Sequence, residues 1–220
     1  MTGPTALLHL AYDDLSALLS ALTEEEGWQP TGCAGWTPVD LGFHLLGDAR
    51  RALVALATPA AEPADTDAVT YWTAWRPPEP GDTEELWSTR IAASTQGGLP
   101  GIAERYAETA AAVGVAAARV AGTDRVRTQG RVLTVADLLS TLVVEAAVHH
   151  LDLVAHLDRP GPADSPLAEV RRVLEGLAGG PLPDRWDDVT AARRGTGRER
   201  LTAADRLELG PVAARFPLFG

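Results

Sequence analysis

The chain contains no lysine, and Cys33 is the only cysteine among its 220 residues. All 19 basic residues are therefore arginines. Without a lysine amine the protein cannot form a Schiff base, which excludes lysine-aldolase chemistry and the usual anchoring of pyridoxal phosphate. A single cysteine cannot form an intramolecular disulfide, nor a zinc or iron–sulfur site built from several thiolates. Any thiol chemistry beyond Cys33 must come from a small molecule.

The sequence also lacks a surplus of positive charge and any long hydrophobic run. Its net charge of −11 argues against nucleic acid or an anionic membrane as a partner, because both require a basic surface. No apolar stretch approaches the roughly 20 residues of a membrane-spanning helix. Asp13 and Asp14 interrupt the first apolar residues, so the start of the chain does not match a secretory signal. We expect a cytoplasmic protein that binds neither nucleic acid nor membrane.

Apolar residues recur at helical spacing through most of the first 160 residues. Long connections separate these segments, and the proline-rich connection at 58–81, which carries Tyr71, Trp72 and Trp75, is expected to form a lid or cover. This order is typical of a mainly α protein built on a four-helix bundle. The spacing predicts four long helices and one shorter helix: 5–26, 37–57, 99–121 and 134–157, with the shorter one at 83–94.

A Pro-Gly linker near residue 160 separates a smaller C-terminal segment from the predicted bundle. We expect residues 1–160 to form the bundle and residues 161–220 to pack on it as a small appendage. No glycine-rich motif for binding a dinucleotide or a nucleoside triphosphate is present. Within the appendage the pattern predicts helices at 167–177 and 202–209, a strand or short extended piece at 188–195, and a tail at 212–220 that packs back on the rest.

Two similar helix starts lie far apart in the sequence. Thr37–Asp40 and Thr134–Asp137 each place an acid three residues after a threonine, which is the pattern of a capping box. His44 lies seven residues after the first threonine, while Glu145 and His149 lie eleven and fifteen residues after the second. If the two helices are neighbours, the three side chains lie at one depth in the bundle. Two imidazoles and a carboxylate are a ligand set of catalytic zinc sites that keep one position open.

Each member of this set also has an ordinary structural interpretation. Glu145 and His149 share a helix face, and such pairs often form simple hydrogen bonds at a surface. However, an ionised glutamate among apolar residues needs a cation or hydrogen bonds to offset the loss of water, which favours a metal. His44 lies in an apolar run, where a lone histidine is more often a satisfied core residue. Its matched depth supports the interpretation as a ligand.

Three further polar residues lie on the last predicted bundle helix near this set. Asp152 lies three residues after His149 and can either orient its imidazole or face water. His150 points away from the face of His149, so we expect it to be peripheral. His156 lies near the end of the helix, where it fits a partner of the helix dipole better than a ligand.

Cys33 and Arg198 each lie beside glycines. Cys33 precedes a helix start that can stabilise a thiolate, although a small buried residue beneath Trp36 is the favoured interpretation. Arg198 follows Gly195-Thr-Gly, where glycines let a backbone approach a ligand closely. Its guanidinium suits a carboxylate, although a surface role is the default expectation for an arginine.

Two motifs of the sequence resemble those of a known family. The segment Pro30–Leu45, PTGCAGWTPVDLGFHL, is similar to the N-terminal signature of mycothiol-dependent maleylpyruvate isomerase-like proteins, which belong to the DinB/YfiT-like superfamily. The segment Glu145–Leu153, EAAVHHLDL, is similar to a second signature, a glutamate followed four residues later by a histidine and then by Asp-Leu. The resemblance covers most of residues 5–160.

The resemblance implies a metal-binding four-helix bundle with a divalent metal, commonly zinc, on His44, Glu145 and His149. It also implies that a thiol cofactor, mycothiol, binds as a thiolate at the open position of the metal. In such proteins an arginine of the C-terminal domain helps to hold a substrate carboxylate, and the similar position here is Arg198. The C-terminal segment is short for a complete domain of that kind.

The sequence therefore predicts a metal-dependent enzyme that activates a small thiol, with mycothiol as the candidate, for isomerisation of a small electrophile or for sulfur transfer to it. One alternative is an enzyme of specialised metabolism that uses the metal as a Lewis acid or to activate water, without a thiol. Another is a non-catalytic metal-binding protein of a stress response. The partners would be the thiol and the electrophile, and the protein would be a monomer or a homodimer.

Overall fold

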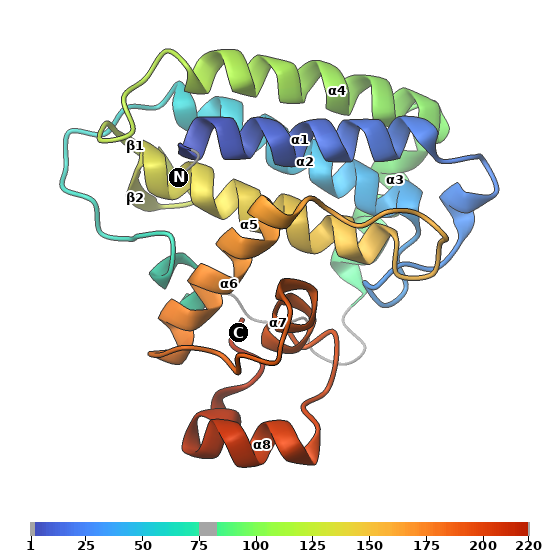
Figure 1. Ribbon diagram of the computed structural model, residues 1–220. Coiled ribbons are helices and arrows are strands. Elements are labelled where there is room, and N and C mark those ends of the chain that lie inside the picture. Colours follow the sequence, from blue (N-terminus) through green and yellow to red (C-terminus); the bar gives the residue numbers. More distant parts are fainter. Residues whose placement is uncertain (1–2, 75–82, 220) are drawn as a thin grey trace.

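Figure 1 shows the computed structural model, which describes residues 3–74 and 83–219. The described chain is mainly helical, and its only strands form one hairpin. Helix α1 packs against α4 and α5, and α2 packs against α4 and α5, so the four helices enclose one core. The predicted mainly α fold built on a four-helix bundle is therefore confirmed. Its four long helices are α1 (Pro4–Ala21), α2 (Pro38–Leu56), α4 (Gly98–Ala117) and α5 (Val135–Leu153).

The first predicted capping box is present at the start of α2. Thr37 Oγ1 accepts the N–H of Asp40 at 3.3 Å, and the Asp40 carboxylate accepts the N–H of Thr37 at 3.0 Å. Pro38 occupies the first turn, where its missing N–H costs nothing. Such a cap contributes about 1 kcal/mol to stability. Arg90 of the short helix α3 (Glu84–Ser94) pairs with the same carboxylate at 2.8 Å, which ties α3 to α2.

The second predicted box, at Thr134, is only half formed. Thr134 Oγ1 accepts the N–H of Asp137 at 3.1 Å, but the Asp137 carboxylate accepts the N–H of Ala68 at 3.1 Å. Thr134 is also the last residue of a strand and pairs with Arg125 across the hairpin. The chain thus enters α5 directly from a strand.

This hairpin was not predicted from the sequence. Strands β1 (Arg125–Thr128) and β2 (Arg131–Thr134) pair antiparallel through a two-residue turn. Gln129 and Gly130 both have positive φ, 47° and 76°, as a tight hairpin turn requires. The strands are short, and glutamine is an unusual first turn residue, so the sequence carries only a weak hairpin signal.

Several helices end earlier than the periodicity indicates. Helix α1 ends at Ala21 because Leu22 is extended, and a short 3₁₀ turn, Glu26–Trp28, follows. Helix α5 ends at Leu153 rather than near residue 157. Apolar residues that continue the helical pattern past these ends pack on the core from irregular backbone, as Leu22 and Leu157 do.

Helix α5 is buried on both faces, which explains its almost continuous apolar sequence. One face, including Leu142 and Val143, lies in the core of the bundle. The other face, including Val144 and Val148, joins a second apolar cluster with the C-terminal segment. Each large apolar side chain buried in this way stabilises the fold by about 1.5–3 kcal/mol. Figure 1 shows the C-terminal helices α6 (Asp164–Ala178), α7 (Asp188–Gly195) and α8 (Ala203–Leu209) on the α5 side of the bundle.

The expectation of a strand or extended piece at 188–195 is wrong, because this segment is helix α7. The Asp187 side chain accepts the N–H of Thr190 at 2.7 Å and caps the helix. Ala191 and Ala192 are buried against the second cluster. A Cβ at Gly195 would lie 2.5 Å from Leu174, so glycine allows α7 to pack closely on α6. Tertiary packing therefore outweighs the β-branched residues at the start of the segment.

The connection after α2 packs against the hairpin and the tail over its described part, residues 58–74. The N–H of Ala60 bonds to Arg125, and the ring of Trp72 stacks on Phe219 with centroids 4.4 Å apart. Leu218 and Phe219 are buried, so the tail packs back on the second cluster. The remainder of the expected lid, including Trp75, lies outside the described residues. Within the described ranges, no helix is long and apolar enough to cross a membrane.

Asp205 holds the C-terminal helices together from a buried position. Its carboxylate accepts from Trp186 Nε1 at 2.9 Å and pairs with Arg185 at 2.5 Å and Arg194 at 2.9 Å. It also completes a capping box with Thr202 at the start of α8. Burial raises the pKa of Asp205, but the bonds from Thr202 and Trp186 and the charge of Arg194 outweigh it and lower the pKa to about 2.

We expect Asp205→Asn to destabilise the protein by about 2 kcal/mol at pH 6. Because the folded-state pKa is depressed, this contribution is present above the unfolded-state pKa near 4 and is lost as the pH falls toward 2. The deficit of the variant should therefore shrink below pH 4. Urea unfolding at several pH values measures it, with exposed Asp184→Asn as the control. A deficit that is independent of pH would contradict the assignment.

Candidate metal centre

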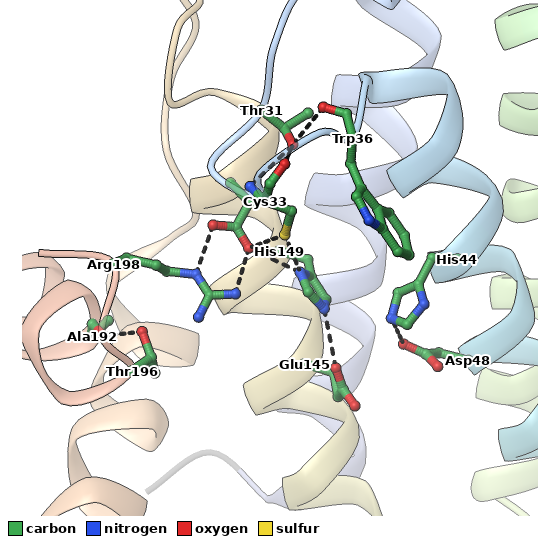
Figure 2. Close-up of polar contacts among 11 residues, drawn as sticks. Thr31, Cys33, Trp36, His44, Asp48, Glu145, His149, Ala192, Thr196 and Arg198 are labelled. Atoms are coloured by element: carbon green, nitrogen blue, oxygen red, sulfur yellow. Dashed lines mark hydrogen bonds and ion pairs between the residues drawn. The ribbon is translucent and has the colours of Figure 1, made fainter. Parts of the chain in front are cut away.

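Helices α2 and α5 each place three polar side chains along one face at the same spacing. Residues four and seven positions apart lie on one side of a helix, so each triplet forms a stripe within an apolar surface. Figure 2 shows His44 and Asp48 of α2 opposite Glu145 and His149 of α5. The complete stripes are His44, Asp48 and Arg51 on α2, and Glu145, His149 and Asp152 on α5.

The three residues predicted as ligands lie together between these helices. Their candidate ligand atoms, from His44, Glu145 and His149, all lie within 4.8 Å of one another. His149 Nε2 is 3.4 Å from Glu145 Oε2, and the two imidazole rings are 5.1 Å apart and nearly perpendicular. Such an arrangement can accept a single divalent cation and leave a coordination position for another molecule.

The charges around this cluster also suit a cation. Three carboxylates, from Asp48, Glu145 and Asp152, lie near two arginines, Arg51 and Arg198. Among the described residues, Asp48 Oδ2 is one of the few buried polar atoms that have no hydrogen-bond partner. A buried carboxylate oxygen without a donor is costly unless a cation compensates it. The residues present therefore fit a bound divalent metal.

His44 is held in the form that a metal requires. Burial, followed by the positive charge of His149, lowers the pKa of His44 to about 4. Its imidazole is therefore neutral at pH 7, and a neutral nitrogen is the metal-binding form. Trp36 packs edge-on against the ring, with centroids 5.4 Å apart, and limits its orientation.

His149 is oriented through its second nitrogen. Nδ1 lies 2.9 Å from Asp152 Oδ2 and 3.9 Å from Cys33 Sγ, while Nε2 faces Glu145. Burial opposes a charge on His149, but its bonds to Asp152, Cys33 and Glu145 raise its pKa well above the usual value. Hydrogen bonding of this kind fixes the ring orientation of metal-binding histidines. Of the two interpretations of Asp152, the contact with His149 is the one observed.

Arg198 lies beside the cluster, but it binds the protein. Its Nε and Nη2 each lie 2.6 Å from an oxygen of Asp152. Burial raises the pKa of Asp152, but the bonds from His149 and Arg198 lower it well below the usual range. The preceding glycines were expected to let the backbone approach a ligand. Instead, a Cβ at Gly197, where φ is +82°, would lie 3.0 Å from Pro217. These glycines permit packing against the protein itself.

The loop from Thr31 to Trp36 closes one side of the cluster. Thr31 Oγ1 donates to the backbone oxygen of Trp36 at 3.0 Å, and the N–H of Gly32 donates to the backbone oxygen of Asp152 at 2.9 Å. A Cβ at Gly32 would lie 2.4 Å from Asp152 Oδ1, so only glycine fits. Cys33 is half-buried and its Sγ lies 3.3 Å from Asp152 Oδ2. The favoured prediction for Cys33 was a small buried residue beneath Trp36. In the structure Cys33 also contacts Asp152 and His149.

The other two histidines of this region lie outside the cluster. His150 is buried, and its Nε2 lies 3.1 Å from the backbone oxygen of Pro160, so it ties the end of α5 to the following linker. His156 is exposed and follows the end of α5. Neither side chain belongs to a group of candidate metal ligands within the described chain.

Asp48 and Arg51 were not singled out from the sequence. Asp48 Oδ2 is 3.4 Å from His44 Nε2, and Arg51 Nη2 is 2.5 Å from Asp48 Oδ1 and 3.9 Å from Glu145 Oε1. The signal was present, because Asp48 follows His44 at the spacing that His149 has after Glu145. Burial, followed by the charge of Glu145, raises the pKa of Asp48 to about 7.

The bundle is of the DinB-like class. A sequence model of the mycothiol maleylpyruvate isomerase N-terminal domain family matches residues 8–154. This match covers more than half of the chain, and the chain therefore belongs to that family. No curated protein and no solved structure matches the chain. The resemblance seen in the two motifs is thus confirmed, and the family is one known for metal and mycothiol binding.

We expect Asp152→Asn to lower the pKa of His149 in the metal-free protein, because the variant removes a carboxylate in contact with Nδ1. An NMR titration of the histidine rings measures this shift. Asp158→Asn, a change at an exposed aspartate beyond the helix, is the matched control and should leave His149 unchanged. Equal pKa values of His149 in both variants would contradict the role given to Asp152.

Proposed function

We propose that the protein is a metal-dependent enzyme that activates a small thiol, with mycothiol as the candidate, for isomerisation of a small electrophile or sulfur transfer to it. The single observation that carries this proposal is the cluster of His44, Glu145 and His149, whose ligand atoms lie within 4.8 Å of one another in a bundle of this family. Zinc is the proposed metal, because two imidazoles and a carboxylate suit it.

The residues around the cluster would each have a defined task. His44 and His149 would supply nitrogen ligands, and Glu145 an oxygen ligand. Asp152 would accept a hydrogen bond from the Nδ1–H of His149 and hold Nε2 toward the metal. Arg51 would balance the charge of Glu145 from 3.9 Å away. When bound, the metal would lower the pKa of a coordinated thiol so that it is a thiolate at neutral pH.

Arg198 is proposed to contact the substrate as well as Asp152. Its bonds to Asp152 use Nε and Nη2, so a substrate carboxylate would bind through Nη1. The side chain is 22% exposed and lies beside Cys33, on the side of His149 opposite Glu145. The guanidinium would orient a carboxylate bound there.

Purified protein reconstituted with zinc should contain about one equivalent of metal by elemental analysis, and His149→Ala should retain far less. His156→Ala, which changes an exposed histidine outside the cluster, is the matched control and should bind like the wild type. A wild-type protein without stoichiometric metal after reconstitution would refute the proposal.

Calorimetric titration of mycothiol into the zinc-loaded protein should show one binding site, and the metal-free protein should show much weaker binding. Turnover of electrophilic alkenes and epoxides should require both the metal and the thiol. Zinc binding without any response to thiol would instead favour the alternative in which the metal activates water or a carbonyl group. Metal binding without turnover of any electrophile above the metal-free control would favour a non-catalytic role.

A further inference from the structure

The family resemblance assigns one histidine of α2 to the metal, but α2 offers a second group beside it. Asp48 follows His44 by one helical turn, and its Oδ2 is 3.4 Å from His44 Nε2. On α5, Glu145 and His149 are likewise one turn apart, and their facing atoms are also 3.4 Å apart. Each helix thus brings a histidine and a carboxylate to the same point.

The free oxygen of Asp48 is the observation that points to a ligand. The Asp48 side chain is only 6% exposed. Within the described ranges its Oδ2 makes no hydrogen bond and has only the 3.4 Å contact with His44 Nε2, whereas its other oxygen is bound by Arg51. A carboxylate with one oxygen anchored and the other buried without a partner is unfavourable unless something positive binds it. The nearest candidate position is the one between His44, Glu145 and His149.

Arg51 fixes which oxygen of Asp48 is available. Arg51 Nη2 contacts Asp48 Oδ1 at 2.5 Å from the next turn of the same helix, and this contact holds the carboxylate by one edge. Asp48 does not belong to the set of atoms that all lie within 4.8 Å of one another, so its carboxylate must turn toward the ion to bind it. A small cavity lined by Asp48, Tyr106 and Glu145 lies beside this carboxylate.

We propose that Asp48 is a fourth protein ligand of the metal, so that the centre consists of two imidazoles and two carboxylates. This inference rests on the proposed function, since it requires the same metal at His44, Glu145 and His149. A set of two nitrogens and two oxygens favours divalent ions such as Zn²⁺, Fe²⁺ or Mn²⁺ over thiophilic Cu⁺. The incoming thiol or substrate then enters as an additional ligand or in place of Asp48.

Instead of a metal, Asp48 Oδ2 could bind a water molecule shared with Tyr106. The hydroxyl of Tyr106 is also buried without a partner in the described structure, and it lines the cavity that Asp48 lines. That cavity has room for about one water molecule, which could bridge the two groups. Tyr106→Phe therefore separates the two roles, because it removes the partner of such a water and leaves the metal position intact.

The first experiment measures the zinc affinity of wild type, Asp48→Asn and Tyr106→Phe with a competing chelator. Loss of a ligand should weaken binding by more than the 10–100-fold that is typical for groups that only orient a ligand. Asp48→Asn should therefore lose more than about 100-fold, and Tyr106→Phe less than about threefold. A smaller loss in Asp48→Asn, or equal losses in the two variants, overturns the proposal.

The second experiment gives a signal that does not depend on the stability of Asp48→Asn. In Co²⁺-loaded Asp48→Cys, a side chain that reaches the metal produces a thiolate-to-cobalt charge-transfer band in the near ultraviolet. Wild type, which retains Cys33, is the matched background and should show no such band. Absence of the band in a variant that still binds cobalt overturns the assignment of Asp48. A wild type that binds no metal at all refutes the proposed function instead, so the two failures are distinct.

Discussion

The carboxylate of Asp152 joins three parts of the chain that are far apart in sequence. It contacts His149 on its own helix, Cys33 in the loop before α2, and Arg198 after α7. The backbone oxygen of the same residue accepts the N–H of Gly32 at 2.9 Å. A buried carboxylate is stable only when it is fully compensated, so each of these partners is required by the others. The orientation of His149 therefore depends on the loop and on the C-terminal segment.

The candidate metal centre also depends on how α5 is buried. Because both faces of this helix are covered, its few polar side chains are removed from water and must satisfy one another or a bound ion. Glu145 and His149 pair at 3.4 Å on the side toward α2, and His150 bonds to Pro160 on another side. The apolar environment lowers the pKa of His44 to about 4 and keeps it in its neutral form. The burial of α5 and α2 thus determines the protonation of the residues at the candidate centre.

Most of the bundle and the convergence of His44, Glu145 and His149 were predictable from sequence, because helical periodicity and the threonine helix starts are local signals. Helix α7 was not predictable, since its conformation depends on Gly195 meeting Leu174 in a distant helix. The hairpin was missed because a Gln-Gly turn between two short strands is a weak signal. Asp48 was missed although its spacing from His44 mirrors that of Glu145 and His149. The assignment of these residues to a metal stays a prediction from the family and the geometry.

Helix α5 contributes residues to both apolar clusters, so the stability of the bundle depends on the C-terminal segment. If residues after the Pro-Gly linker were removed, Val144, Ala147, Val148 and Leu151 would face water, and Asp152 would lose Arg198. Removal of the C-terminal segment would therefore destabilise the bundle. A ligand that binds only the ordered centre shifts the equilibrium away from locally opened forms. Occupancy of a centre on α2 and α5 would therefore also protect the distant C-terminal helices from cleavage.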